Sequence, residues 1–154
     1  MIFSILAAVS GLALAAVSIQ NALFSDFLSK DMQRHVSNAM KYAAIENVPV
    51  QLLLGIIFVE SRGSEKKKFG ANGEIGICQM KKIAFIDVVN NSGEDFQGFE
   101  FESLLNDEIA IKFCARFLRL LYNAAGDWKT AIRSYNCCGL NVGRAAANPD
   151  LSKE

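Results

Sequence analysis

Five large apolar residues recur at every fourth position in the C-terminal half of the chain, and this spacing limits the fold more than any other feature. The five are Leu105, Ile109, Phe113, Phe117 and Leu121. Side chains four residues apart lie on one face of an α-helix, so the spacing predicts a long amphipathic helix. Asp107 and Glu108 fall in its first turn, where negative charge favours the helix dipole.

Helical patterns also precede and follow this segment. We expect helices over residues 34–46, from Pro49 to Val59 and over residues 81–89, and a last helix capped by Asp127. Proline suits the first turn of a helix because its missing N–H would have no partner there. The second helix is apolar nearly all round, which predicts that it is buried. No segment alternates apolar and polar residues as a half-buried strand does, so the sequence predicts an all-α domain.

The first 25 residues carry no charge, and the first charged residue is Asp26. About 20 apolar residues span the hydrocarbon of a membrane as a helix. We therefore expect one N-terminal transmembrane anchor over residues 1–25, a linker over residues 26–33 and a single domain over residues 34–154. A cleaved signal peptide is the alternative, but signal peptides begin with a positive region, and no Lys or Arg precedes this apolar run.

The positive charges nearest to the apolar segment follow it, at Lys30, Arg34 and Lys41. Positive residues tend to stay on the cytoplasmic side of a membrane, so their position favours a cytoplasmic domain. A membrane protein of a virus, assembled inside the cell and delivered later, would fit this topology.

Charge and histidine content argue against several functions. The 16 basic and 16 acidic residues balance, and nothing resembles the basic surface that holds a phosphate backbone, so we expect no nucleic-acid partner. A zinc site normally takes more than one histidine, and the chain has only His35, which we interpret as an ordinary surface residue. We expect neither a metal nor an organic cofactor. The three lysines at 66–68 predict a solvated loop.

The four cysteines do not define a redox compartment. Cys114 lies in the apolar helical pattern and is interpreted as core packing. Cys137 and Cys138 are adjacent, and a disulfide between neighbours is strained, so two free thiols are expected. A bridge from Cys78 to one of them in an oxidising space is the alternative.

Glu60 stands at the end of the apolar stretch that begins at Val48 and is its one acidic residue. Ile57 and Ile56 lie three and four residues back, on the same face of the helix. Gly63 suits the end of that helix. Apolar neighbours and the negative end of the helix dipole both favour the protonated carboxyl, which a general acid for glycosidic cleavage requires. The alternative is an acidic residue that merely marks a helix end and reaches solvent.

Three short segments extend this pattern in order along the chain. They are Glu60-Ser61, the run Gly76-Ile77-Cys78-Gln79-Met80, and Ser134-Tyr135-Asn136 followed by Gly139. Together they resemble the soluble lytic transglycosylase family, in the goose-lysozyme-like clan of wall-cleaving enzymes. The resemblance covers about residues 34–144 and implies a lysozyme-like fold. Departures from the family pattern are Cys78, where a hydrophobic residue is usual, and Cys137-Cys138, where small residues are usual.

The resemblance implies a role for each matched residue. Glu60 would protonate the oxygen between N-acetylmuramic acid and N-acetylglucosamine, then take a proton from the muramic acid C6 hydroxyl, which closes a 1,6-anhydro ring. Gln79 would bind sugar, and Tyr135 would hold Glu60 in position through its hydroxyl. Ser61 and Asn136 would support that arrangement as part of the substrate-binding set.

Two other functions stay open. If Glu74, which lies in the loop before Gln79, reached the site as a second carboxylate, the reaction would be hydrolysis by a muramidase; we interpret it as a surface loop residue. The chain could also be a non-catalytic glycan-binding membrane or virion component. We expect a single-pass membrane enzyme that opens the cell wall from the periplasm, in phage entry or in a secretion or conjugation apparatus, with other membrane proteins of that assembly as partners.

Overall fold

The structure, a computed structural model, describes residues 28–64, 68–137 and 139–141. Helices dominate this part of the chain. They are α2 (Lys30–Glu46), α3 (Val50–Ser61), α4 (Lys82–Asn90), the short 3-10 helices η1 (Glu94–Phe96) and η2 (Phe101–Leu105), α5 (Asp107–Ala125) and α6 (Trp128–Cys137). Within the described residues the extended pairing is limited to isolated bridges, from Ile75 to Phe69 and to Met80. The all-α prediction is confirmed for this part of the chain.

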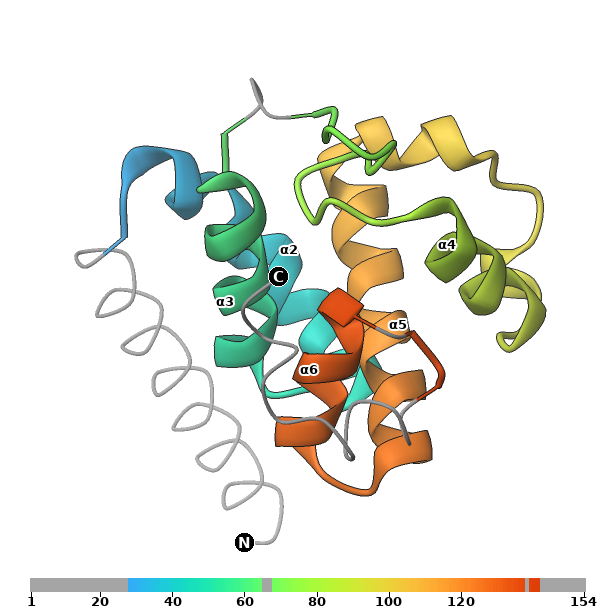
Figure 1. The fold of residues 1–154 in the computed structure, drawn as a ribbon. Coiled ribbons are helices and arrows are strands. Elements are labelled where there is room, and N and C mark those ends of the chain that lie inside the picture. The colour runs from blue at the N-terminus through green and yellow to red at the C-terminus, as the bar shows by residue number, and fades with distance from the viewer. Residues whose placement is uncertain (1–27, 65–67, 138, 142–154) are drawn as a thin grey trace, which may run out of the picture.

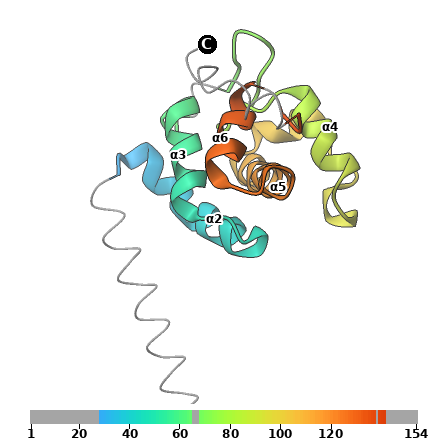
Figure 2. The ribbon, with the colours of Figure 1, turned by 60° about the horizontal axis from the view of Figure 1, so that its bottom comes forward.

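Helix α5 is the centre of the domain. It contacts α2, α3, α4, α6 and η2. The view in Figure 2 runs nearly along its axis, and the other helices lie around it. Its buried residues include Phe113, Phe117 and Leu121 of the predicted apolar face. The side chain of Asn106 caps its start by accepting hydrogen bonds from the N–H groups of Glu108 and Ile109. The predicted long helix is therefore confirmed.

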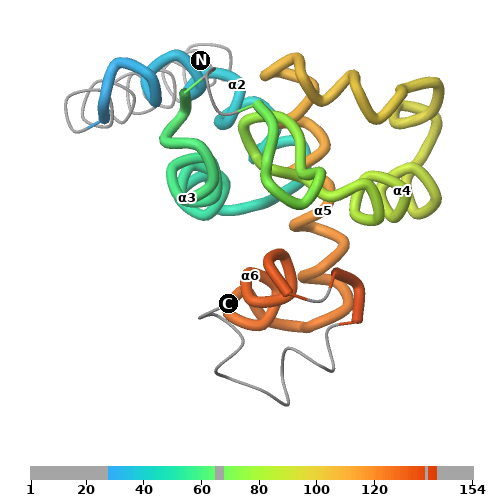
Figure 3. The backbone as a smooth tube through the Cα atoms, turned by 45° about the horizontal axis from the view of Figure 1, so that its top comes forward, coloured from blue at the N-terminus to red at the C-terminus, as the bar shows by residue number. Residues whose placement is uncertain are grey.

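The two sides of α5 are covered differently. Figure 1 shows α2 and α3 on one side and α4 on the other, and the tube in Figure 3 shows the 3-10 segment beside α4. An aromatic cluster fastens this second side: the ring of Phe113 stacks on Phe85 at 5.1 Å between centroids and meets Phe96 and Phe99 edge-on at 5.2 and 5.4 Å. Such pairs add to the free energy gained by burial alone.

The predicted helix boundaries differ from the structure at several ends. The first helix begins at Lys30 rather than at Arg34, because the Ser29 hydroxyl caps it by accepting from Met32 N at 3.3 Å. The predicted linker therefore includes the first turn of α2. Helix α4 matches its prediction to within one residue at each end. Asp127 caps α6 as predicted, with Thr130 N donating to its Oδ1 at 2.8 Å.

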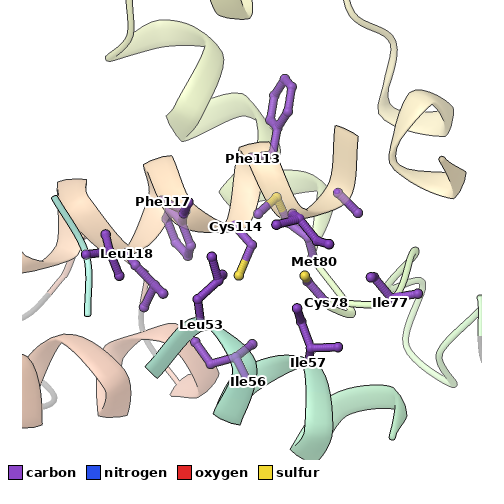
Figure 4. Packing of buried hydrophobic residues seen from close by; sticks show 14 of the residues in the cluster. Leu53, Ile56, Ile57, Ile77, Cys78, Met80, Phe113, Cys114, Phe117 and Leu118 are labelled. Atoms are coloured by element: carbon purple, nitrogen blue, oxygen red, sulfur yellow. The ribbon is translucent and has the colours of Figure 1, made fainter. Parts of the chain in front are cut away.

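Helix α3 has one buried and one exposed face. Leu53, Ile56 and Ile57 are buried and face α5, as Figure 4 shows. Phe58 and Val59 keep 43% and 65% of their surface exposed, so the prediction of a fully buried helix is wrong for this face. The reason is that α3 packs against α2 and α5, and among the described residues no element covers its outer side.

No helix among the described residues is long and apolar enough to cross a membrane. The predicted anchor, residues 1–25, lies outside the described residues.

The cysteines differ from their prediction. Cys137 is disulfide-bonded, which corrects the expectation of a free thiol at this position. Cys78 is free and buried, so it is not the partner of Cys137. Cys114 is free and fully buried in α5, and its prediction as a core residue is confirmed.

Candidate active site

The last turn of α3 places Glu60. The residue is half-buried and follows the buried Ile56 and Ile57 of the same face by one helical turn. Arg62 ends the helix in the left-handed region, with φ 57°, and its N–H donates to the carbonyl of Phe58 at 3.0 Å. Glu60 therefore projects from a helix whose end has a defined conformation.

Two buried side chains fix the turn after Glu60. The Ser61 hydroxyl donates to the Ile57 carbonyl and accepts from Gly63 N, both at 3.1 Å. His35 lies across on α2, and its Nε2 donates to the Gly63 carbonyl at 2.9 Å. Because a carbonyl only accepts, Nε2 carries a proton. His35 is 3% exposed, so its prediction as a surface residue is wrong: it replaces solvent as the donor to a buried carbonyl.

Gly63 lets the end of α3 approach the start of α2 closely. A Cβ at this position would lie 2.9 Å from the sulfur of Met32 and 3.0 Å from the carbonyl carbon of Asp31, and the residue has φ +71°. Only glycine meets both conditions without strain. The segment that carries Glu60 is therefore tightly packed against the first turn of the domain.

The segment from Lys68 to Lys81 carries Gln79 without regular secondary structure. Ile75 and Met80 exchange two backbone hydrogen bonds, of 3.1 and 3.0 Å, which closes a tight turn around Gln79. Gln79 has φ +45°, and its side-chain Nε2 donates to the carbonyl of Gly76 at 2.8 Å. We call residues 68–81 the Gln79 loop. In the ribbon it lies between the end of α3 and α4 (Figure 1).

The Gln79 loop is held against the start of α5. A Cβ on Gly76 would collide with the carbonyl oxygen of Leu104, so the backbones touch here. Lys68 donates from Nζ to the carbonyl of Leu105 at 2.8 Å and lies 3.8 Å from the Asp107 carboxylate. The prediction of a solvated loop is therefore wrong for Lys68, because its ammonium group binds a carbonyl and a carboxylate of the neighbouring segment.

Glu74 is bound within the Gln79 loop. Its carboxylate accepts from Asn72 N at 2.9 Å and lies 4.0 Å from Lys81 Nζ, and only 14% of its side chain is exposed. A hydrogen bond from its own backbone N–H, followed by the bond from Asn72 N and the charge of Lys81, lowers the pKa of the Glu74 carboxyl. A Cβ added at Gly70 would contact both Glu74 and Gln79, so these two side chains are near one another.

Tyr135 joins α6 to the Gln79 loop. Its hydroxyl donates to the carbonyl of Cys78 at 2.8 Å and accepts from the Cys114 thiol at 3.5 Å. The ring packs against Phe117 of α5 at 5.6 Å. Burial raises the pKa of the Tyr135 hydroxyl well above its usual value, so the group remains a neutral donor.

The packing of α3 brings Glu60 to the same site. Ile57, one turn before Glu60, points toward Cys78 of the Gln79 loop, as Figure 4 shows. After burial, which is the main cause for Tyr135, a charge on Glu60 adds a minor effect that raises the pKa of the Tyr135 hydroxyl, and it does the same for the Cys78 thiol. The structure thus assembles the three predicted segments, although they are far apart in sequence: Glu60 on α3, the Gln79 loop and Tyr135 on α6.

The supporting residues differ in accessibility. Ser61 is 2% exposed, and its hydroxyl is occupied by the backbone of the helix end, a geometry that favours support of Glu60 over contact with sugar. Asn136 is exposed on α6. The contact of Tyr135 with Glu60 stays a prediction, because its single proton is donated to Cys78. Two residues of the site were missed as such from the sequence: His35 and Cys114, whose partners are distant along the chain.

The described residues contain no group of three His, Cys, Asp or Glu side chains that could hold a metal ion. Comparison with protein-family models matches residues 37–154 to the transglycosylase SLT domain. No curated protein and no solved structure matches the chain.

Proposed function

The chain belongs to the transglycosylase SLT domain family, and on this premise we propose that it is a lytic transglycosylase that cleaves the bond between N-acetylmuramic acid and N-acetylglucosamine in peptidoglycan and releases a 1,6-anhydro product. One observation supports the proposal: Glu60 lies in the last turn of α3, where Ile57 packs beside Cys78 of the Gln79 loop, and Tyr135 binds the Cys78 carbonyl of that loop.

A single carboxyl group suffices for this reaction. Glu60 gives its proton to the glycosidic oxygen, and the bond from that oxygen to C1 of the muramic acid breaks. The resulting carboxylate takes the proton of the C6 hydroxyl, whose oxygen bonds to C1. The proton count on Glu60 is restored, and no water is consumed, so the second carboxylate of a hydrolase is not needed.

The other site residues would bind or orient. Gln79, held in a tight turn by Gly76, would hydrogen-bond the sugar or its acetamido group. Tyr135 would keep the Gln79 loop, and through it the sugar, in register with Glu60. Ser61 would support the end of α3. Asn136 is exposed in the last turn of α6 and would contact substrate.

Hydrolysis is the second candidate, with Glu74 as the general base for water. The contacts of Glu74 favour the transglycosylase, since Asn72 and Lys81 bind its carboxylate within its own loop. A non-catalytic glycan-binding protein is the third candidate; in it Glu60 would only accept hydrogen bonds from sugar hydroxyls, and no glycosidic bond would be cleaved.

Digestion of purified peptidoglycan by the full-length chain, with mass analysis of the products, tests these functions. Anhydro-muramic ends support the transglycosylase, and reducing ends mean hydrolysis. Glu60→Gln removes the proton donor and should lower the rate by at least about 100-fold. Glu102→Gln, an exposed matched control on η2, should leave it unchanged. Absence of products from the wild type, with binding to the glycan intact, would refute both enzymatic functions.

We further propose that residues 1–25 anchor the chain in a membrane and that the domain acts on the wall from the periplasm, as part of a membrane-containing phage or of a secretion or conjugation apparatus. The charge-free segment supports the anchor. Protease protection of the chain in sealed vesicles tests the side on which the domain lies, and release of the chain by carbonate wash would refute the anchor.

A further inference from the structure

Two hydrogen bonds under the candidate site link α5, α6 and the Gln79 loop. The Cys114 thiol donates to the Tyr135 hydroxyl at 3.5 Å, and this hydroxyl donates to the Cys78 carbonyl at 2.8 Å. The thiol and the hydroxyl each have one proton, so each of them donates once. We call these two bonds the Cys114–Tyr135–Cys78 chain.

The two cysteines of this chain are buried in the core, and Tyr135 is half-buried. Cys78 and Cys114 are 1% and 0% exposed. Figure 4 shows Cys114 reaching from α5, and Cys78 from the Gln79 loop, into the space above Ile56 and Ile57 of α3. Hydrogen bonds are stronger in such surroundings, and a group left without its partner there is costly.

The Cys78 thiol and the Tyr135 hydroxyl keep their protons at neutral pH. The neighbouring Cys114 side chain, followed by burial, raises the pKa of the Cys78 thiol well above its usual value. Burial likewise raises the pKa of the Tyr135 hydroxyl. Both groups therefore stay neutral rather than acting as nucleophiles.

The Cys114–Tyr135–Cys78 chain fixes the peptide group that leads into Gln79. The Cys78 carbonyl and the Gln79 N–H belong to one planar unit, and this N–H donates to the Gly76 carbonyl at 3.0 Å. Tyr135 thus holds one edge of that plane and Gly76 the other. Gln79 itself has φ +45°, a conformation that a residue with a side chain keeps only when its surroundings hold it.

We propose that Cys114 is a positioning residue: its thiol orients the Tyr135 hydroxyl toward the Cys78 carbonyl and thereby sets Gln79 relative to Glu60. This inference rests on the proposed function for its catalytic consequence, whereas the two hydrogen bonds of the Cys114–Tyr135–Cys78 chain do not depend on that function. Without the thiol, the hydroxyl loses its donor, and the edge of the Gln79 peptide loses part of its restraint. A role in packing alone would not act through the Tyr135 hydroxyl.

A double-mutant cycle separates these two roles. In the full-length chain, Cys114→Ala should lower kcat/KM on soluble glycan strands about threefold to tenfold, the range for one lost buried hydrogen bond. In the Tyr135→Phe background the same substitution should change kcat/KM by less than about twofold, because the hydroxyl that it acts on is absent. Cys114→Ser, which keeps a donor, should recover most of the loss. Val88→Ala, a buried control on α4, should give the same factor in both backgrounds.

Hydrogen exchange of backbone amides gives a readout that does not need catalysis. Cys114→Ala should accelerate exchange at Gln79 and Met80, whose N–H groups close the turn, and Val88→Ala should not. An inactive wild type with this exchange pattern would refute the proposed function but support the restraint of Gln79 by the Cys114–Tyr135–Cys78 chain. An equal loss of kcat/KM from Cys114→Ala in both backgrounds, or unchanged exchange at Gln79 and Met80, would overturn the positioning role.

Discussion

The two parts of the candidate site are held in place in different ways. The end of α3 is fixed by a helix and its termination: Ser61 binds the backbone of its own last turn, and His35 completes the set from the neighbouring helix. The Gln79 loop has no helix of its own. Its conformation depends on contacts with Leu104 on η2 and with Tyr135 on α6, segments that follow much later in the chain.

This difference teaches where the geometry of the site is vulnerable. The end of α3 gains part of its order from hydrogen bonds within its own last turn, which form together with the helix. A loop without repeating structure has that order only once its distant partners are in place. Changes beneath the Gln79 loop should therefore disturb the site over a longer range than changes at the end of α3.

The largest effect is expected from Gly76→Ala in the Gln79 loop. Gly76 has φ +75°, and the added Cβ would collide with the carbonyl of Leu104. Strain and collision together should lower the free energy of unfolding by about 2–4 kcal/mol, measured by urea denaturation.

Gly73→Ala isolates the part of this loss that comes from strain. Gly73 lies in the same loop with φ +82°, and an added Cβ would have no atom within 4 Å. We expect a loss of about 1 kcal/mol there. Equal losses at the two glycines would mean that the contact with Leu104 does not hold the loop.

A smaller effect is expected at the end of α3 from His35→Leu. The substitution leaves the buried Gly63 carbonyl without its donor and should cost about 1–3 kcal/mol of unfolding free energy. Amide exchange should accelerate over residues 60–64 and stay unchanged around Gln79.

His35→Gln serves as the matched variant, because its amide supplies an N–H donor. It should recover part of the loss. Equal acceleration of exchange at Gln79 and at residues 60–64 in His35→Leu would show that the two parts of the site are a single cooperative unit.

The smallest effect is expected from Glu74→Gln, and it depends on pH. The folded state lowers the pKa of this carboxyl, so its charge stabilises the fold above the pKa of the unfolded chain, and the stabilisation is lost as pH falls through the folded pKa. At pH 7 the variant should melt about 2 °C below the wild type, and the difference should shrink as pH falls below the unfolded-state pKa of about 4.3.

Glu102→Gln, at an exposed position, controls for the loss of one negative charge from the surface. A difference between wild type and Glu74→Gln that stayed constant from pH 7 to pH 3 would assign the effect to the shape of the side chain rather than to its charge.

The sequence was sufficient to predict the helices and the position of Glu60. Spacing of apolar residues predicted α5, Asp127 predicted the start of α6, and an acidic residue at the end of an apolar helix identified Glu60. Each of these signals acts within one or two helical turns, so the local sequence contains all of it. The start of α2 was missed because Ser29, its capping residue, stands before a charged first turn that has no apolar period.

Contacts between distant residues could not be predicted in the same way. Tyr135 and the Cys78 carbonyl are 57 positions apart, and His35 and the Gly63 carbonyl are 28 apart. In both pairs the acceptor is a backbone carbonyl, which every residue has, so no residue type signals the contact. The exposed face of α3 was missed for a related reason: apolar composition shows that a helix can be buried but not which neighbours cover it.

The two faces of α3 also offer a way to observe the site without entering it. Glu60 lies on the face that continues from Ile56 and Ile57, whereas Gly55 lies on the exposed side, where an added Cβ would have no atom within 4 Å. A fluorescent or spin label attached at position 55 would lie on the same helix, α3, as the proposed proton donor, but on its opposite, exposed face. It would report movement of α3 when a glycan strand binds, without occupying the proposed binding site.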